Sequence, residues 1–126
     1  MVGSNGAGAT TPHDLAVIFR AAMANPVFAQ IIVQPTATFP TKTGDRPLTN
    51  DDELLHRYPG TLGGKTGFTD AAKKTFVAAA DRGGRRLVIA MMYGLIKAGG
   101  PTYWDQAIGL FDWGFAQDGR VSVASL

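Results

Sequence analysis

Two apolar runs separated by a pair of glycines restrict the fold of this chain more than any other feature. The runs occupy residues 75–80 and 87–93, and charged residues flank Gly83 and Gly84 between them. Adjacent glycines accept the backbone angles of a tight turn, so the pattern predicts a β-hairpin. A helix is the alternative for residues 70–82, because that stretch is rich in alanine and lysine. We favour the strand, and with it an antiparallel sheet.

Helical patterns lie on both sides of the predicted hairpin. Thr11, Pro12 and Asp14 resemble a capped helix start. Apolar side chains then recur at helical spacing, at Leu15, Ile18, Phe19, Ala22 and Met23. Asn25-Pro26 ends this helix and starts a short second one that runs through Ile31. Residues 101–117 form a further amphipathic pattern, with one apolar face made by Trp104, Ala107, Ile108, Phe111 and Phe115.

The remaining segments have weaker signals. Residues 1–11 are polar and glycine-rich and are predicted to form a flexible arm, and residues 119–126 are predicted to be a tail. Residues 36–47 are expected to be a loop or weak strands, because prolines and a glycine interrupt them. Residues 50–58 are expected to hold a short helical segment. Residues 12–118 would then form one α/β (α+β) unit, an antiparallel sheet with packed helices.

Composition excludes several functional classes. The net charge of the 126 residues is only +2 and no basic stripe is visible, which does not favour a nucleic-acid binder. The chain has no cysteine, which removes disulfides, thiolate metal sites and a cysteine nucleophile. His13 and His56 have no partners at metal-ligand spacing, so we expect no metal and no cofactor. No signal peptide and no apolar run of about 18 residues is present.

Two clusters of charge have plain structural interpretations. Asp51, Asp52 and Glu53 are consecutive and are predicted to be a solvated helix start, where acidic side chains favour the positive end of the helix dipole. Arg82, Arg85 and Arg86 surround the predicted hairpin turn and are expected to keep that end soluble. Contact with an anionic polymer is the alternative for the arginines.

The stretch Gly63-Gly64-Lys65-Thr66-Gly67 raises the question of a phosphate-binding loop. That loop requires G-x-x-x-x-G-K-[ST] with a helix beginning at the lysine. With Gly64 as the second glycine, the first should stand at position 59, which is Pro59. Gly67 would also fall where the helix should begin, and glycine is costly there. A phosphate-binding loop is therefore only a remote alternative.

The surroundings of this stretch match a different family. The chain carries a leucine pair (Leu54-Leu55), Tyr58-Pro59-Gly60, Gly63, and then the run from Lys65 to Thr69 before the predicted strands. This order resembles the serine-type D-alanyl-D-alanine carboxypeptidases, which are low-molecular-weight penicillin-binding proteins with the β-lactamase/transpeptidase-like fold. The segment "GPTYWDQAIGLFDWGF" looks closest to actinobacterial members. The resemblance covers about residues 9–118.

The resemblance implies a role for each residue of the Lys-Thr-Gly run. Lys65 would place a positive charge near the terminal carboxylate of the substrate, and the hydroxyl of Thr66 would hydrogen-bond that carboxylate. Gly67 would let the substrate backbone approach the strand, with Thr69 on the same face. The N–H of Phe68 would belong to the oxyanion hole. The resemblance also implies strands near 64–69, 74–82 and 86–94, about three of the five strands of the family sheet.

The nucleophile of the family is absent from these 126 residues. It is the serine of an S-x-x-K motif, and none of Ser4, Ser122 and Ser125 has a lysine three positions later. The S-x-N motif is absent as well, since Asn5 follows Ser4 directly. In the family both motifs precede the region present here. We therefore expect a C-terminal half of a catalytic domain, with no catalytic residue of its own and no activity alone.

The implied partners follow from the family. If the missing amino-terminal half completes the site, the ligands would be peptidoglycan stem peptides and β-lactams, and the location would be extracytoplasmic. The alternative is a non-catalytic remnant that only binds peptide or has a structural role. Neither interpretation involves nucleic acid or a membrane segment in this chain.

Overall fold

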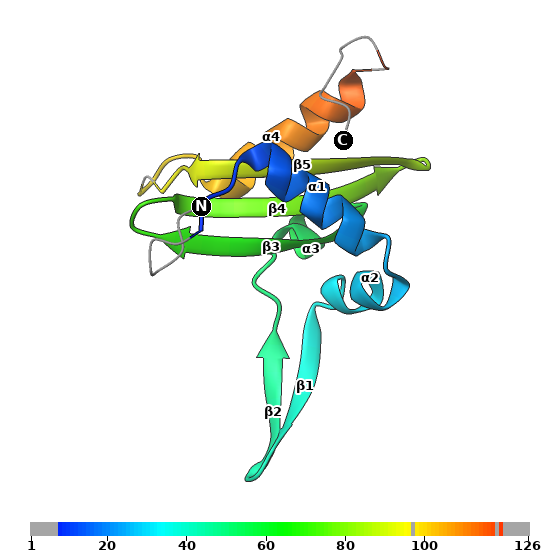
Figure 1. The fold of residues 1–126 in the computed structure, drawn as a ribbon, viewed down its shortest axis with the longest axis vertical. Coiled ribbons are helices and arrows are strands. Elements are labelled where there is room, and N and C mark those ends of the chain that lie inside the picture. Colours follow the sequence, from blue (N-terminus) through cyan, green and yellow to red (C-terminus); the bar gives the residue numbers. More distant parts are fainter. Residues whose placement is uncertain (1–7, 97, 118, 120–126) are drawn as a thin grey trace.

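The computed structural model describes residues 8–96, 98–117 and 119, and it is an α/β structure built around an antiparallel three-stranded sheet (Figure 1). The predicted fold class is confirmed. The elements, in chain order, are α1 (Pro12–Met23), α2 (Pro26–Ile32), β1 (Thr36–Thr41), β2 (Gly44–Thr49), α3 (Leu54–Arg57), β3 (Thr61–Thr69), β4 (Lys73–Arg82), β5 (Arg85–Gly94) and α4 (Tyr103–Ala116).

The hairpin predicted from the double glycine joins β4 to β5. Arg82 pairs with Arg85 across the turn, and Gly83 and Gly84 both have positive φ angles, 61° and 84°. These angles are strained for residues with a side chain, which explains why glycine occupies both turn positions. Residues 73–82 are therefore a strand, and the helical alternative for this segment is wrong. The sheet order is β3-β4-β5, with β4 in the centre.

Helices cover both faces of the central strand (Figure 1). The side chains of Phe76, Ala78 and Ala80 face α4 and belong to the main core, which also includes Trp104 and Phe111. Val77 and Ala79 alternate with them and pack on the other side, against Phe19 of α1. A strand that is buried on both faces has no polar alternation, and this explains its continuous run of small apolar residues.

The predicted starts of α1 and α2 are confirmed, whereas the start predicted for the last helix, at residue 101, is two residues too early. The Thr11 hydroxyl accepts a hydrogen bond from the Asp14 N–H (3.1 Å), and the Asn25 side chain accepts from the N–H groups of Val27 and Phe28. α4 begins at Tyr103, two residues after Pro101, because Thr102 and Asp105 form a reciprocal capping box there. Each cap satisfies backbone donors that the helix itself leaves unpaired.

Residues 36–49 form a two-stranded hairpin, β1–β2, that projects from the rest of the molecule (Figure 1). Every residue of both strands is exposed, including Phe39 and Leu48. The weak-strand alternative for residues 36–47 is thus the correct one. Pro40 and Pro47 are tolerated because each strand has only one neighbour in this two-stranded sheet.

The structure describes only part of the two predicted terminal segments. Residues 1–7 of the predicted arm and residues 120–126 of the predicted tail lie outside the described residues, so both predictions stand untested.

Within the described ranges, no single helix is long and apolar enough to cross a membrane. α1 and α2 pass that test only as a pair, and they are bent by 106° at their junction.

The Tyr58-Pro59-Gly60 turn brings β3 and β4 together where the sheet begins. Gly60 has a φ angle of +93°, and its carbonyl accepts a hydrogen bond of 2.8 Å from the Asp81 N–H. A Cβ atom on Gly60 would lie 2.2 Å from the carbonyl oxygen of Asp81. The glycine is therefore required twice, by its backbone angle and by the contact with a neighbouring strand.

We expect Gly60→Ala to lower the free energy of unfolding by roughly 3 kcal/mol or more, because both backbones must shift to remove the overlap. For a domain of this size that is a fall of about 12 °C or more in the melting temperature. Gly83→Ala is the control, since Gly83 also has a positive φ angle but nothing lies within 4 Å of the added Cβ. It should cost only about 1–2 kcal/mol. Equal melting temperatures for the two variants would contradict the steric argument.

Candidate functional site

The Lys-Thr-Gly run lies within β3, which is an edge strand of the three-stranded sheet. Lys65, Thr66 and Gly67 pair with Val77, Phe76 and Thr75 of β4, respectively. No described strand pairs with the other edge of β3. The residues are therefore part of a strand, whereas a phosphate-binding loop would require a helix to begin at Lys65. The structure gives no support to the nucleotide-binding alternative.

Side chains of the run alternate between the two faces of the sheet. Lys65 and Gly67 lie opposite Val77 and Thr75 and line a cavity of about 460 Å³ together with apolar side chains of α1 and α2. On the other face, Phe68 contributes to a second cavity, of about 290 Å³, with Lys74 and with Tyr103 and Trp104 of α4. Thr66 and Gly67 line both cavities. The edge of β3 thus lies between these two cavities.

A lysine ammonium group lies on each side of the β3 edge. The Lys65 ammonium group donates a hydrogen bond to the carbonyl oxygen of Thr66, and its side chain is exposed. The Lys74 ammonium lies 5.4 Å from the ring centroids of both Phe68 and Tyr103. Such cation–π contacts hold the lysine over the aromatic surface. Asp51 and Glu53 add carboxylates to the smaller cavity, so it has a mixed charge.

The predicted site residues are neighbours on one strand, and one of them, Thr69, also has a structural role. Lys65, Thr66, Gly67 and Phe68 are consecutive along the edge of β3. Thr69 is the last residue of the strand, and its hydroxyl accepts a hydrogen bond of 3.0 Å from the Ala72 N–H. The Thr69 side chain therefore also stabilises the turn into β4.

Two glycines set the position of the run relative to the rest of the chain. A Cβ atom on Gly63, whose φ angle is +124°, would lie 2.9 Å from the carbonyl oxygen of Ile32 at the end of α2. A Cβ atom on Gly64 would lie 2.8 Å from both the Phe76 ring and the Val77 carbonyl oxygen. Only glycine permits these approaches without displacing backbone atoms. The backbone of β3 immediately before Lys65 is accordingly fixed by packing.

The structure corrects the interpretation of Asp52. The sequence predicts a solvated acidic run, and Asp51 and Glu53 are indeed exposed, but Asp52 is only 1% exposed. One carboxylate oxygen, Oδ1, accepts a hydrogen bond from the Leu54 N–H. The other, Oδ2, lies 2.9 Å from the position that a Cβ on Gly64 would occupy. Sequence pattern alone does not reveal this residue beside the site.

The arginines near the β4–β5 turn also do more than provide solubility. Arg85 donates hydrogen bonds to the carbonyl oxygens of Gly114 and Phe115, at the end of α4. Arg82 pairs with Asp112 at 3.2 Å and lies over the rings of Tyr58 and Phe115. Burial raises the pKa of the Tyr58 hydroxyl to about 12, and its hydrogen bond to Asp112 adds to this effect. These contacts fasten α4 to the sheet.

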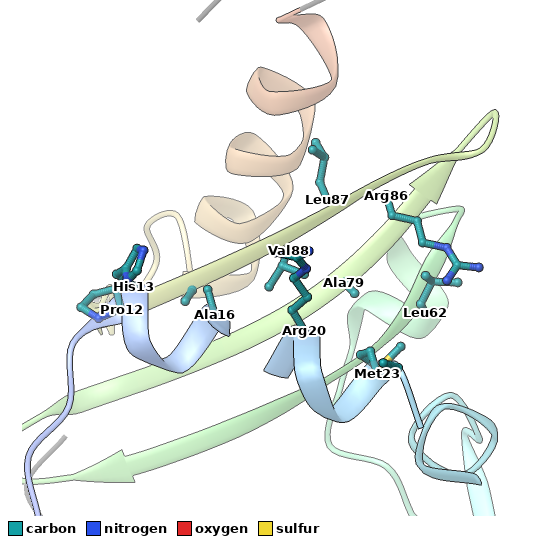
Figure 2. Close-up of a pocket in the computed structure, with 12 residues that line it drawn as sticks. Pro12, His13, Ala16, Arg20, Met23, Leu62, Ala79, Arg86, Leu87 and Val88 are labelled. Carbon is teal, nitrogen blue, oxygen red and sulfur yellow. The ribbon is translucent and has the colours of Figure 1, made fainter. Parts of the chain in front are cut away.

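A larger cavity, of about 680 Å³, lies between α1 and the sheet (Figure 2). Lys65, Thr66 and Gly67 are not among the residues that line it. Its walls are mainly apolar, with Ala16 and Met23 on α1 and Leu87 and Val88 on β5. His13, Arg20 and Arg86 provide its titratable groups. It contains neither a carboxylate nor a hydroxyl nucleophile among its lining residues, so we do not assign the candidate site to it.

Comparisons with known proteins identify the family to which the sequence is similar. The sequence matches the D-alanyl-D-alanine carboxypeptidase family over residues 3–94. It is 69% identical over 124 residues to the D-alanyl-D-alanine carboxypeptidase DacB2 of Mycobacterium tuberculosis, covering 98% of this chain and 43% of that protein. It is 35% identical over 118 residues to a D-alanyl-D-alanine carboxypeptidase of Streptomyces sp. strain K15, covering 89% of this chain and 40% of that protein.

Solved structures of carboxypeptidases and transpeptidases resemble the fold of this chain. The crystal structure of a D-alanyl-D-alanine carboxypeptidase from M. tuberculosis matches with a TM-score of 0.90 and 68% identity, over all of this chain and 48% of that chain. The Streptomyces K15 DD-transpeptidase matches with a TM-score of 0.75 and 33% identity, over 91% of this chain and 45% of that chain. The chain spans less than half the length of the relatives it matches.

Proposed function

Because this chain belongs to the D-alanyl-D-alanine carboxypeptidase family, we propose that it supplies the substrate-binding wall of a serine-type enzyme that hydrolyses the terminal D-Ala-D-Ala bond of peptidoglycan stem peptides. The nucleophile would come from a segment that carries the S-x-x-K serine, since no serine in these 126 residues has that motif. The same site would accept β-lactams. The family acts on the bacterial cell wall, so we propose an extracytoplasmic location.

The unpaired edge of β3 is the observation that carries this proposal. An extended peptide can add to such an edge as a further strand, with main-chain hydrogen bonds that do not depend on its side chains. Gly67 has no side chain to obstruct that approach. Lys65 and Thr66 stand at the same edge, beside the larger of its two cavities, and provide a cation and a hydroxyl for a terminal carboxylate.

The chemistry assigned to the wall is electrostatic. In the acylation step the serine Oγ attacks the carbonyl carbon of the penultimate D-Ala, and the oxygen of that carbonyl becomes negative. The Phe68 N–H is proposed to stabilise this charge. The C–N bond then breaks, the proton released by the serine hydroxyl ends on the amine of the departing D-alanine, and water later hydrolyses the serine ester. Lys65 and Thr66 hold the carboxylate of this D-alanine until it departs.

The alternative is a non-catalytic role in peptide binding alone. An experiment separates the two. The chain is joined to the amino-terminal segment of a family member that carries the S-x-x-K serine; we call this the joined polypeptide. It should release free D-alanine from a peptide ending in D-Ala-D-Ala, and not from one ending in L-Ala-L-Ala. A folded joined polypeptide that binds the peptide and releases no D-alanine would favour the binding role.

A further inference from the structure

Asp52 is a buried carboxyl group directly beneath the candidate site. It is 1% exposed, and in the part of the chain that the structure describes its Oδ2 atom has no hydrogen-bond partner. Oδ2 lies 2.9 Å from the position that a Cβ on Gly64 would occupy, and the ring of Phe76 lies 2.8 Å from the same position; Gly64 immediately precedes Lys65. A carboxylate that is charged in such surroundings is costly unless a cation pairs with it. No ion pair involving Asp52 is found among the described residues.

The turn that carries Asp52 connects three parts of the fold. Asn50 donates hydrogen bonds from its side chain to the carbonyl oxygens of Ile32 and Gln34, and its own side-chain oxygen accepts from the Asp52 N–H. Asp52 Oδ1 then accepts from the Leu54 N–H at the start of α3. The turn therefore ties the end of α2 and the base of the β1–β2 hairpin to α3, and it presents Oδ2 to β3.

The titratable groups around Asp52 would offset a negative charge on its carboxylate only weakly. His56 of α3 is the one basic group that favours its ionised form, while Asp51 and Glu53 on the same segment are acidic. On α4, burial raises the pKa of the Tyr103 hydroxyl, and the carboxylates of Glu53 and Asp51 add to this effect, so the hydroxyl is neutral at ordinary pH. Burial raises the pKa of the Asp52 carboxyl, against the lowering effects of the Leu54 N–H and His56.

We propose that Asp52, with its carboxyl group in the neutral form, is a positioning residue. It packs against the backbone of Gly64 and thereby holds the Lys65–Phe68 run of β3 in position. The importance of that run rests on the proposed function, but the positioning itself does not. A neutral carboxyl fills the space against Gly64 and Phe76 without a buried unpaired charge. Ionisation places a negative charge there and loosens the strand at the point where the substrate wall begins.

The expected pH dependence follows from the direction of the shift. The folded chain binds the Asp52 proton more tightly than the unfolded chain does. The resulting stabilisation is fully present below the ordinary carboxyl pKa, near 4, and is lost as the pH rises through the raised pKa of the folded state. Asp52→Asn has the same shape and no charge at any pH, so it should remove this loss.

Melting temperatures of the 126-residue chain between pH 4 and pH 8 test the proposal. Asp52→Asn should match the parent near pH 4 and melt at a higher temperature than the parent at pH 8, by a few degrees or more. Asp45→Asn is the matched control, because it makes the same chemical change on the exposed β1–β2 hairpin, and it should not reproduce the gain in melting temperature at pH 8. Asp52→Ala loses the acceptor for Leu54 and should be less stable than Asp52→Asn at every pH.

Hydrogen exchange of the amides of residues 64–68 separates positioning from general stability. After correction for intrinsic rates, their protection relative to β4 should fall with rising pH in the parent and stay constant in Asp52→Asn. The proposal is overturned if Asp52→Asn does not fold, if it melts with the parent at all pH values, or if these amides show no separate response. Neither measurement requires a nucleophile, so failure of the proposed enzymatic function would leave both results intact.

Discussion

Lys65→Ala in the joined polypeptide should slow acylation by a fluorescent penicillin about 10- to 150-fold. The change removes a cation proposed to bind the carboxylate of the ligand, and a charge-assisted contact of this kind is worth roughly 1.5–3 kcal/mol. Each 1.36 kcal/mol corresponds to about a tenfold change in rate. The Lys65 side chain is exposed, so the melting temperature should change little. The measurement is the second-order acylation rate together with a thermal melt.

Two further variants serve as comparisons for the effect of Lys65→Ala on the acylation rate. Thr66→Val removes one neutral hydrogen bond and keeps the shape of the side chain, so it should slow acylation only about 2- to 10-fold. Lys42→Ala is the charge-matched control: Lys42 lies in the exposed turn between β1 and β2 and should leave the rate within about twofold. If Lys65→Ala is acylated at the rate of Lys42→Ala, the Lys-Thr-Gly run does not bind the ligand carboxylate.

The sheet could be predicted from the sequence because local chemistry specifies it. Gly83 and Gly84 fix the β4–β5 turn, and the apolar run on each side then defines a strand. The register between β3 and β4 could not be predicted in the same way. It depends on Gly60 and on a bulge between Thr61 and Gly63, where the pairing shifts by one residue. These features result from contacts between segments about 20 residues apart, which a periodic pattern does not encode.

The β1–β2 hairpin shows a different limit. Its prolines and its glycine resemble loop signals, and the same residues are compatible with a strand only where one edge is left unpaired. Whether an edge is free is a property of the assembled sheet. The sequence therefore leaves the choice between a loop and weak strands open, and the fold decides it.

For the site, the order of residues along the chain predicted the Lys65–Thr69 run, because a single strand carries all of it. Asp52 was predicted to be solvated because its neighbours Asp51 and Glu53 are acidic, yet Gly64, Phe76 and the Leu54 N–H enclose it. Arg85 was similarly predicted to be a surface residue, although it binds the carbonyl oxygens at the end of α4. Burial of a charged residue depends on distant segments, and its local sequence gives no signal for it.

The division of roles that we propose, with the substrate-binding wall from this chain and the nucleophile from an S-x-x-K segment, can be tested by covalent chemistry. Intact-mass measurement after incubation with benzylpenicillin tests both parts. The 126-residue chain alone should gain no mass, because none of its three serines has the required lysine. The joined polypeptide should gain one penicilloyl group per molecule, at the S-x-x-K serine. A stoichiometric, heat-stable adduct on the 126-residue chain, or none on a folded joined polypeptide, would contradict the account.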